Sequence, residues 1–362
     1  MREISVGSLK IGDTLASSIH CGFSYRLLLP KGTVVTEEHL SRLSSLKAQG
    51  HCLVLEPSDV EGIRLDLLDR LDEKVKRAYL DTYVVGKSIF ENLQHGNPVN
   101  IKLACEAVDV LIGEIMRRGD LLLQLAANRL IDDYTFSHMV NVAVYTASYG
   151  KFQNWGMGDV SDLCLAGLLH DVGKARLPTD VLNKREELTA EELALVRSHP
   201  EYGYIELRQI SEVNERVRQG VLQHHERGDG SGYPKGLRHK EISRFARVIA
   251  VADVYDALTS DRCYRNRVLP HEGAEVLIGD SALNRLDLEI VRVFLSSIVL
   301  YPVGTEVILS DGRQARVILI NDGFPLRPVL EVLESTDSGT RIPVGVVHLL
   351  EHPTLFIKRV VG

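Results

Sequence analysis

The sequence predicts a mainly α-helical protein with a small α+β module at its N-terminus and a small β-rich module at its C-terminus. From about Glu61 to Ser297, apolar residues recur at three- and four-residue steps, as expected where a helix buries one face. Before and after this region, short apolar runs alternate with turn residues, a pattern typical of β-strands. A chain of 362 residues can bury a substantial core and divide it among several domains.

The N-terminal α+β module is expected over residues 1–57. Its β-like runs are LKIGDTLASSI, YRLLLPKGTVV and HCLVLEP, and the segment TEEHLSRLSSLKAQG predicts a short helix before the third. Thr36 is a suitable N-cap for that helix, and Gly50 is suitable at its end. A helical connecting segment is expected over residues 58–118. Its first part, to about Leu93, either packs against the following helices, which we favour, or mediates a homodimer.

The main helical domain is expected over residues 119–300, and the β-rich module over residues 301–362. In this last module, YPVGTEVILSDGRQARVILI contains two β-type runs separated by SDGR, which is a turn sequence. The segments PVLEVLES and TRIPVGVVHLL continue the β pattern toward the C-terminus.

Composition excludes several classes of protein. The chain carries 42 basic and 49 acidic residues, a net charge of −7, which argues against coating a nucleic-acid polymer but allows a phosphate ligand in a local basic pocket. Its five cysteines form no CxxC pair, so neither a disulfide framework nor a cysteine zinc site is expected, and a reducing cytoplasm fits best. The N-terminus lacks the apolar core of a signal peptide, and no run reaches the roughly 18 apolar residues of a membrane span.

The first chemical signal is the pair His170–Asp171 in LCLAGLLHDVGKARLP. An apolar helical run ends at this pair, so the carboxylate is expected to be partly buried, and an unpaired buried charge costs several kcal/mol. A cation would remove that cost. Because adjacent helix residues point about 100° apart, His170 can bind one ion while Asp171, with two oxygens, reaches the same ion or bridges to a second.

A second signal is the stretch HHERGDGSGYP, which places two adjacent imidazoles, His224 and His225, before a glycine-rich loop. Its glycines allow the backbone to approach a ligand closely, whereas the alternative is a solvated turn. Farther along, Asp253 interrupts the apolar sequence VIAVA. Its alternative role is to accept hydrogen bonds from the backbone or from an arginine.

Two more histidines complete the set. His138 begins a well-patterned helix, and His199 precedes Pro200, which indicates the end of a helix. Each alone would be unremarkable, but the order H…HD…H…HH…D supplies five imidazoles and two carboxylates: His138, His170, Asp171, His199, His224, His225 and Asp253. This set exceeds the needs of one tetrahedral ion and predicts two metals with a bridging carboxylate. Nitrogen and oxygen ligands without thiolate suit iron or manganese, although zinc, nickel or cobalt could also bind them.

This order resembles the HD-GYP branch of the HD metal-dependent phosphohydrolases. The resemblance covers about Ile131 to Arg267 and rests on HDVGK, HHERGDGSGYPKGL and ARVIAVADVYDALTSDRCYR, which match the characteristic segments of that family. It implies a five-helix HD-type catalytic bundle with attached helices, a metal cluster at its centre, and hydrolysis of the bacterial second messenger cyclic di-GMP.

The resemblance also implies roles for individual residues. The seven residues above become metal ligands, with Asp171 bridging. Lys174 corresponds to a lysine that contacts a phosphate and assists departure of the leaving oxygen, and Arg262 and Arg265 fall where the family has cationic phosphate contacts. Tyr233 matches the tyrosine of the GYP loop, which lies near the substrate pocket and is implicated in contacts with diguanylate cyclase (GGDEF) domains.

Two positions depart from the family pattern. Some members carry a glutamate four residues before the first histidine, where it helps to hold a third metal. Here that position is Tyr134, and a phenol is a poor ligand at neutral pH, so two metals are expected. Cys263 stands where a proline is usual, which is expected to adjust the loop without disabling it.

The expected activity is that of a cyclic di-GMP phosphodiesterase that opens the ring to linear pGpG, with onward cleavage to GMP left open. Two cations that share a hydroxide lower the pKa of bound water from about 15.7 towards 7, which provides a nucleophile. Two alternatives remain: a phosphohydrolase of another cyclic dinucleotide or nucleotide, and a non-catalytic receptor or scaffold that binds cyclic di-GMP or a cyclase domain. The complete ligand set argues against the scaffold.

Overall fold

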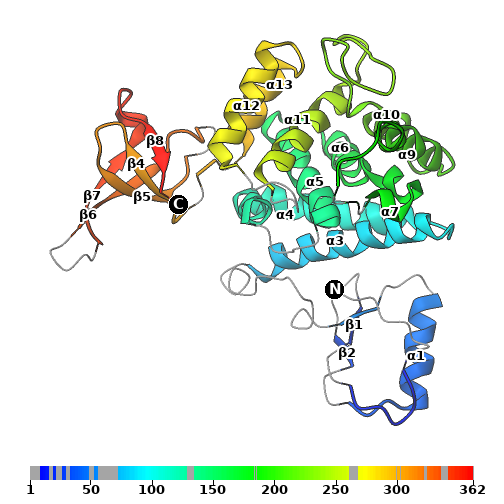
Figure 1. The fold of residues 1–362 in the computed structure, drawn as a ribbon. Helices are drawn as coiled ribbons and strands as arrows, with labels where there is room; N and C mark the ends of the chain where they lie inside the picture. The colour runs from blue at the N-terminus through cyan, green and yellow to red at the C-terminus, as the bar shows by residue number, and fades with distance from the viewer. Residues whose placement is uncertain are drawn as a thin grey trace.

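The structure of the chain is a computed structural model that describes residues 9–15, 19–21, 27–29, 33–48, 53–55, 72–128, 134–182, 184, 186–260, 268–298, 300–301, 303–321, 324–335 and 341–361. Figure 1 shows a small N-terminal sheet with a helix, a large helical body, and a small C-terminal sheet. The predicted fold class, mainly α with small β-containing modules at both ends, is confirmed.

The N-terminal part combines a small antiparallel sheet with one helix. Its strands β1 (Ile19–Cys21), β2 (Leu27–Leu29) and β3 (Leu53–Leu55) lie in the order β2-β1-β3. Helix α1 (Glu37–Ala48) lies between β2 and β3 in the chain. The Thr36 hydroxyl accepts a hydrogen bond from the backbone N–H of His39 (3.3 Å), as expected of an N-cap.

The helical body contains two long helices followed by shorter ones. Its elements are α3 (Glu73–Gln94), α4 (Ile101–Asn128), α5 (Tyr134–Phe152), α6 (Met157–Leu169), η3 (Val172–Arg176), α7 (Thr179–Leu182), α8 (Ala190–Val196), α9 (His199–Arg208), α10 (Glu215–Gln223), α11 (Arg244–Thr259), α12 (Pro270–Ala282) and α13 (Leu288–Ser297). Among the described residues, none of the helices combines the length and the apolar character that a membrane crossing requires.

Helix α5 lies at the centre of this body. It is buried on every side from residue 137 to residue 150, and it packs against α3, α4, α6, α11 and α13. A helix of this kind must be covered all round by other elements, because no face of it is suited to water. Polar side chains on α5, such as His138 and Asn141, therefore lie inside the protein, where they need polar partners.

The expected connecting segment is part of the same packed body. Helix α3 packs along α4 and α5 and buries large side chains such as Tyr79 and Phe90. The boundary expected at residue 118 falls inside α4. There, Arg118 has a non-helical backbone (φ −144°, ψ 49°) that kinks the helix.

The C-terminal sheet is antiparallel throughout. Its strands β4 (Glu306–Leu309), β5 (Gln314–Leu319), β6 (Val329–Ser335), β7 (Arg341–His348) and β8 (Ile357–Val360) lie in the order β7-β6-β5-β4-β8. The predicted SDGR turn connects β4 to β5, and Gly312 in this turn has a positive φ of 91°. Val307 and Leu309 alternate with more exposed residues along β4, so one face of this strand is buried.

Candidate metal centre

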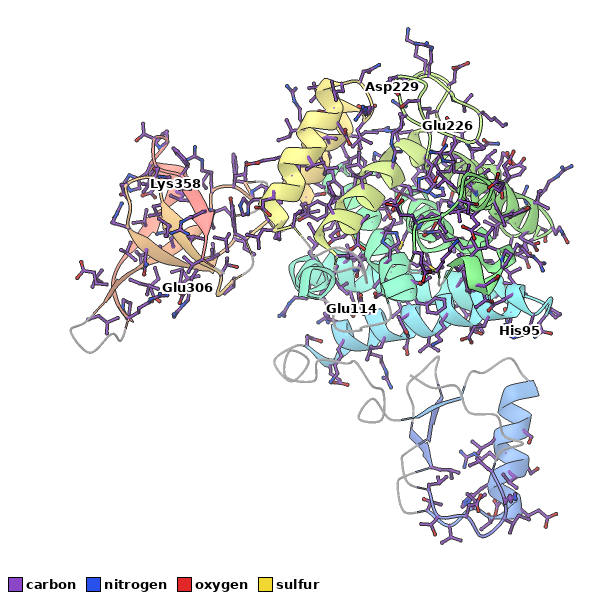
Figure 2. The ribbon with its side chains drawn as sticks, viewed as in Figure 1. His95, Glu114, Glu226, Asp229, Glu306 and Lys358 are labelled. Carbon is purple, nitrogen blue, oxygen red and sulfur yellow. The ribbon has the colours of Figure 1, made fainter. Side chains whose placement is uncertain are left out.

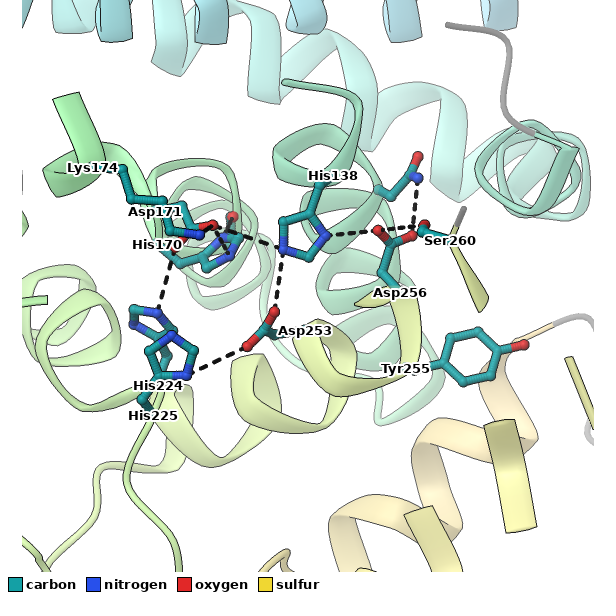
Figure 3. Close-up of polar contacts among 12 residues, drawn as sticks. His138, His170, Asp171, Lys174, His224, His225, Asp253, Tyr255, Asp256 and Ser260 are labelled. Atoms are coloured by element: carbon teal, nitrogen blue, oxygen red, sulfur yellow. Dashed lines mark hydrogen bonds and ion pairs between the residues drawn. The ribbon is translucent and has the colours of Figure 1, made fainter. Parts of the chain in front are cut away.

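The seven side chains singled out by the sequence meet inside the helical body, and all of them except His199 are labelled in Figure 3. His138 lies in the second turn of α5, while His170 and Asp171 directly follow α6. His224 and His225 directly follow α10, and Asp253 lies within α11. Asn214 and Ser243 cap the starts of α10 and α11 by accepting backbone hydrogen bonds, from Val217 and Ala246 respectively. These caps help to define the helices from which the site is built.

The position of His199 differs from the expectation. Pro200 was expected to mark the end of a helix, but His199 is the first residue of α9, with the proline in the first helical turn. Proline is well suited to this place, because its missing N–H would have no partner within the helix. His199 therefore enters the site from a helix start, after α8 has ended at Val196.

Gly173 allows the HD segment and His199 to lie together. A Cβ on Gly173 would lie 2.0 Å from the carbonyl oxygen of His199 and 2.4 Å from the backbone nitrogen of Gly203. Only a residue without a side chain permits this close approach between η3 and α9. The glycine of HDVGK thus controls the distance between the candidate ligands of the two segments.

The candidate ligands form two groups that share Asp171. In one group, ligand atoms of Asp171, His199, His224 and His225 all lie within 4.8 Å of one another, and in the other, those of His138, His170 and Asp171 do so. Oδ1 of Asp171 lies 3.1 Å from Nε2 of His199, and its Oδ2 lies 3.4 Å from Nε2 of His170. The two oxygens of one carboxylate therefore face different groups of imidazoles.

Asp253, on α11, lies between the same two groups of imidazoles. Its Oδ1 lies 3.2 Å from Nε2 of His138, and its Oδ2 lies 3.7 Å from Nδ1 of His225. Figure 3 shows this carboxylate between the two rings. The arrangement offers oxygen donors to both groups.

The imidazole tautomers suit metal binding. Nδ1 of His170, His199 and His224 lies 2.8, 2.8 and 2.6 Å from the backbone carbonyl oxygens of Gly167, Val196 and Val221. A carbonyl oxygen can only accept, so each Nδ1 carries the proton and donates it. The lone pair of each ring is then on Nε2, which points into the cluster, as is usual for metal-binding histidines.

Two buried polar atoms support the fit to a cation. Nε2 of His170 and Oδ1 of Asp171 are fully buried and have no hydrogen-bond partner within the described part of the chain. Leaving such atoms unsatisfied costs about 1–3 kcal/mol each, and more for a charged group. A divalent cation coordinated by these atoms would remove that cost. The residues present therefore fit a metal centre.

The pKa shifts favour the protonation states in which these groups bind metals, an ionised carboxylate and neutral imidazoles. Burial works toward a raised pKa of the Asp171 carboxyl, but the charge of Lys174, together with interactions with His170 and His199, outweighs burial and holds the pKa well below its ordinary value. Burial lowers the pKa of His224 and of His225 well below the ordinary 6.5. Asp171 is thus ionised and the histidine pair is neutral at neutral pH.

In the metal-free protein the pKa of His138 shifts in the opposite direction to those of His224 and His225. Burial disfavours its imidazolium, but hydrogen bonds to Asp253 and Asp256 outweigh burial and raise its pKa to about 9. The protonated ring donates to one carboxylate from each nitrogen. A cation at Nε2 would take the place of the proton that faces Asp253.

Two residues expected to contact substrate lie at the edge of the cluster. The ammonium of Lys174 lies 2.6 Å from Oδ2 of Asp171, and its side chain is 28% exposed. The ring of Tyr233 lies against that of His225, with centroids 4.7 Å apart, and the guanidinium of Arg197 lies 5.5 Å from the Tyr233 centroid. The sequence reasoning missed Arg197, which is exposed and comes from the end of α8.

The glycine-rich loop packs on its own backbone. A Cβ on Gly232 would lie 2.3 Å from the backbone nitrogen of Arg227, so this glycine lets the loop fold back beside the histidine pair. The buried carboxylate of Glu226 accepts hydrogen bonds from the backbone N–H groups of Lys235 (2.7 Å) and Leu237 (2.9 Å). Figure 2 shows Glu226 and Asp229 on this loop. The sequence predicted close backbone approach here. It did not predict that the Glu226 carboxylate would hold the two sides of the loop together through these hydrogen bonds, an arrangement called the Glu226 clamp below.

Four residues discussed in the sequence analysis lie outside the described residues or side chains. Arg262, Cys263 and Arg265 belong to residues 261–267, which the structure does not describe. Helix α5 begins at Tyr134, and the structure describes the backbone of this residue but not its side chain. The expected roles of these residues stay predictions.

Comparison with known proteins identifies two family matches. The model described as an HD domain matches residues 109–290. A model described as a KOW domain associated with HD domain matches residues 306–362, which include the C-terminal sheet.

Individual relatives are enzymes named for cyclic dinucleotides. Cyclic di-GMP phosphodiesterase PA4108 of Pseudomonas aeruginosa is 36% identical over 263 residues, which are 72% of this chain and 63% of the relative. Cyclic di-GMP phosphodiesterase PdeB of Borreliella burgdorferi is 29% identical over 207 residues, 57% of this chain and 54% of the relative. The 3'3'-cGAMP-specific phosphodiesterase 1 of Vibrio cholerae is 32% identical over 162 residues, 45% of this chain and 37% of the relative. The chain thus spans less than two-thirds of the length of each of these relatives.

A solved structure agrees with the fold. Bd1817, an HDG"Y"P protein from Bdellovibrio bacteriovorus, superimposes with a TM-score of 0.52 at 20% identity, covering 81% of this chain and 97% of that chain. The HD domain match itself covers half of the present sequence and contains all seven candidate ligands. The chain therefore belongs to the HD domain family, as its resemblance to the HD-GYP branch led us to expect.

Proposed function

We propose that this chain is a metal-dependent phosphodiesterase that hydrolyses cyclic di-GMP to linear pGpG. The observation that carries the proposal is the sharing of Asp171 between two groups of candidate ligands. Such a pair of neighbouring cation positions suits phosphate ester hydrolysis. The relatives from Pseudomonas aeruginosa and Borreliella burgdorferi, whose names specify cyclic di-GMP, support the choice of substrate.

In this proposal the seven side chains hold two divalent cations, iron or manganese. The nitrogen and oxygen donors, without thiolate, suit these metals. When bound, the cations supply an activated water and offset the charge that develops on the phosphate. Asp171 would offer one oxygen to each group of imidazoles, and Asp253 would add carboxylate oxygens between His138 and His225.

The chain's own residues perform the remaining steps. Lys174 holds its ammonium beside the cluster, where it can contact a phosphate and give a proton to the leaving 3′ oxygen. The ring of Tyr233 lies against that of His225 at the edge of the cluster. We include Arg262 and Arg265 as phosphate contacts, on the strength of the family resemblance alone.

The test is product formation by protein that is reconstituted anaerobically with iron or manganese. The expected product is pGpG, and GMP is measured in the same assay. His170→Ala and Asp171→Ala are expected to abolish turnover, whereas Asp180→Ala, which changes an exposed carboxylate on α7, is expected to retain it. Metal-loaded protein that binds cyclic di-GMP but forms no product would contradict the proposal and favour a receptor or scaffold, including one that binds GGDEF domains through the GYP loop.

A second candidate substrate is 3'3'-cGAMP. It is favoured by the similarity to an enzyme of Vibrio cholerae whose name specifies that dinucleotide. Competition between the two dinucleotides in one reaction separates these candidates. A higher kcat/KM for cyclic di-GMP is expected, and the reverse order would assign the chain to the second substrate.

A further inference from the structure

The ring of His138 is held from both sides. Its Nε2 faces the cluster, 3.2 Å from Oδ1 of Asp253, whereas its Nδ1 lies 2.7 Å from Oδ2 of Asp256 on the next turn of α11. Asp256 is 1% exposed and lies on the far side of the ring from the other candidate ligands. It is thus placed to orient His138 without joining the cluster (Figure 3).

Asp256 is itself held by several donors. Besides His138, its Oδ2 accepts a hydrogen bond from the hydroxyl of Ser260 (3.1 Å), and its Oδ1 accepts one from Nδ2 of Asn141 (2.9 Å). The carboxylate oxygens thus accept from donors on α5 and from Ser260, the residue that directly follows α11. These contacts restrict the carboxylate to one orientation.

Asn141 extends the chain of contacts to α3. Because its Nδ2 donates to Asp256, its Oδ1 must face the other way, where it accepts a hydrogen bond from the phenol of Tyr79 (2.6 Å). Tyr79 and Asn141 are 0% and 1% exposed, so water does not compete for these bonds. Tyr79 lies before residue 109, where the HD domain match begins.

We infer that Tyr79, Asn141 and Asp256 form a positioning chain that fixes the ring of His138 for metal binding, and that α3 thereby completes the metal centre from outside the matched HD domain. The inference rests on the proposed metal-dependent function. Asp256 keeps the proton of His138 on Nδ1 and leaves the Nε2 lone pair for a cation. Asn141 and Tyr79 keep Asp256 in the position that does so.

The first test is metal affinity. Loss of an outer partner of this kind typically weakens metal binding about 10–100-fold. Asp256→Asn is expected to weaken the binding of one of two Mn²⁺ ions by an amount in that range. An amide that donates to Nδ1 of His138 shifts the ring proton to Nε2, where it competes with the metal. Tyr79→Phe removes one hydroxyl and is expected to weaken binding of the same ion by about 3–10-fold, a smaller effect because Tyr79 is two hydrogen bonds more remote from His138 than Asp256 is. Titration with Mn²⁺, monitored by calorimetry or EPR, measures the affinities of both variants.

A matched control separates positioning from general stability. Thr82→Val also removes a buried hydroxyl from α3, but that hydroxyl donates within the helix, to the carbonyl oxygen of Ala78 (2.8 Å). Thr82→Val is expected to leave Mn²⁺ affinity unchanged, even if it lowers the unfolding temperature. Equal Mn²⁺ affinities of the wild type and Tyr79→Phe would overturn the inference.

The double variant tests whether the residues act in series. If Tyr79 acts through Asp256, then adding Tyr79→Phe to Asp256→Asn causes little further loss of Mn²⁺ affinity, whereas independent effects would multiply. Multiplying effects would overturn the positioning chain. Should Asp256→Asn not fold, Tyr79→Phe and its Thr82→Val control still decide the matter. A wild type that binds no Mn²⁺ defeats the proposed function as well, whereas a wild type with two Mn²⁺ and insensitive variants defeats only this inference.

Discussion

The ammonium of Lys174 lies 2.6 Å from Oδ2 of Asp171, the oxygen that faces His170. The two residues are three apart, and the short η3 helix after the HD pair turns the lysine back toward the carboxylate. The lysine expected to act on the leaving oxygen is therefore already beside the candidate bridging ligand.

Lys174→Met is expected to lower kcat by about 100-fold or more, because loss of a proton donor at the leaving group typically costs this much. The number of bound Mn²⁺ ions is expected to stay the same, since no lysine nitrogen is needed as a ligand. Steady-state kinetics and metal analysis on the same preparation check both. Lys184→Met is the control, because Lys184 has similar exposure and pairs with Glu192 instead. Unchanged kcat in Lys174→Met would refute the role.

Gly173→Ala is expected to lower the free energy of unfolding by about 3 kcal/mol, because its methyl group would meet backbone atoms that cannot move aside easily. It is also expected to reduce Mn²⁺ affinity by separating His199 from Asp171. Denaturant unfolding and Mn²⁺ titration measure the two effects. Gly158→Ala is the control. A Cβ at this position has no atom of the described residues within 4 Å, so the change should not be destabilising.

Glu226→Gln is expected to loosen the glycine-rich loop. One oxygen that accepts a backbone N–H is replaced by an amide nitrogen that cannot, which costs about 1–3 kcal/mol. Since Tyr233 belongs to this loop, KM for the dinucleotide is expected to rise more than kcat falls. Glu241→Gln, which changes an exposed acceptor for the N–H of Arg238 in the same region, should leave KM unaltered. The same KM in both variants would count against the clamp.

The metal-free protein is expected to lose stability as the pH falls below about 6.5. Burial keeps the pKa of His224 and of His225 well below 6.5, so the unfolded chain takes up protons that the folded chain does not. His225→Asn is expected to flatten the fall in unfolding temperature between about pH 6.5 and about pH 5. His348→Asn, at an exposed position of β7, should keep the wild-type slope. Identical slopes in all three proteins would exclude this origin of the pH dependence.

Asp81 is expected to make the stability of the protein fall as the pH rises, the opposite of the effect of the histidine pair. Asp81 is 6% exposed, and its Oδ1 has no hydrogen-bond partner among the residues that the structure describes. Burial raises the pKa of its carboxyl from 3.8 to about 8, against the opposing charge of Arg77. The stability contributed by its neutral form is therefore complete below about pH 4 and is lost as the pH rises toward 8.

Asp81→Asn removes this titration. The variant is expected to unfold at a higher temperature than the wild type, with a difference that grows from about pH 5 to about pH 8. Thermal unfolding at several pH values checks this, with Asp180→Asn as the exposed control. A difference that shrinks with rising pH would show that Asp81 is not the group responsible.

Much of the organisation could be predicted from sequence because it depends on local patterns. Apolar spacing predicted the helical body, and the SDGR turn predicted the β4–β5 connection. The residue types of HD, HH and Asp253 selected the side chains that the structure brings together, since few other uses explain carboxylates and imidazoles within apolar helices. The start of α9 was mistaken for a helix end because Pro200 is compatible with both places.

The sequence by itself determined which chemistry the chain carries: imidazoles and carboxylates without thiolates, set at the ends of apolar helices and followed by a glycine-rich loop. Only the tertiary structure decided that the two oxygens of Asp171 face separate groups, and that Tyr79 and Asn141, 62 residues apart, support His138 through Asp256. Local patterns reflect forces within a few residues, whereas these contacts depend on how whole helices pack, and packing brings together side chains that no sequence spacing relates.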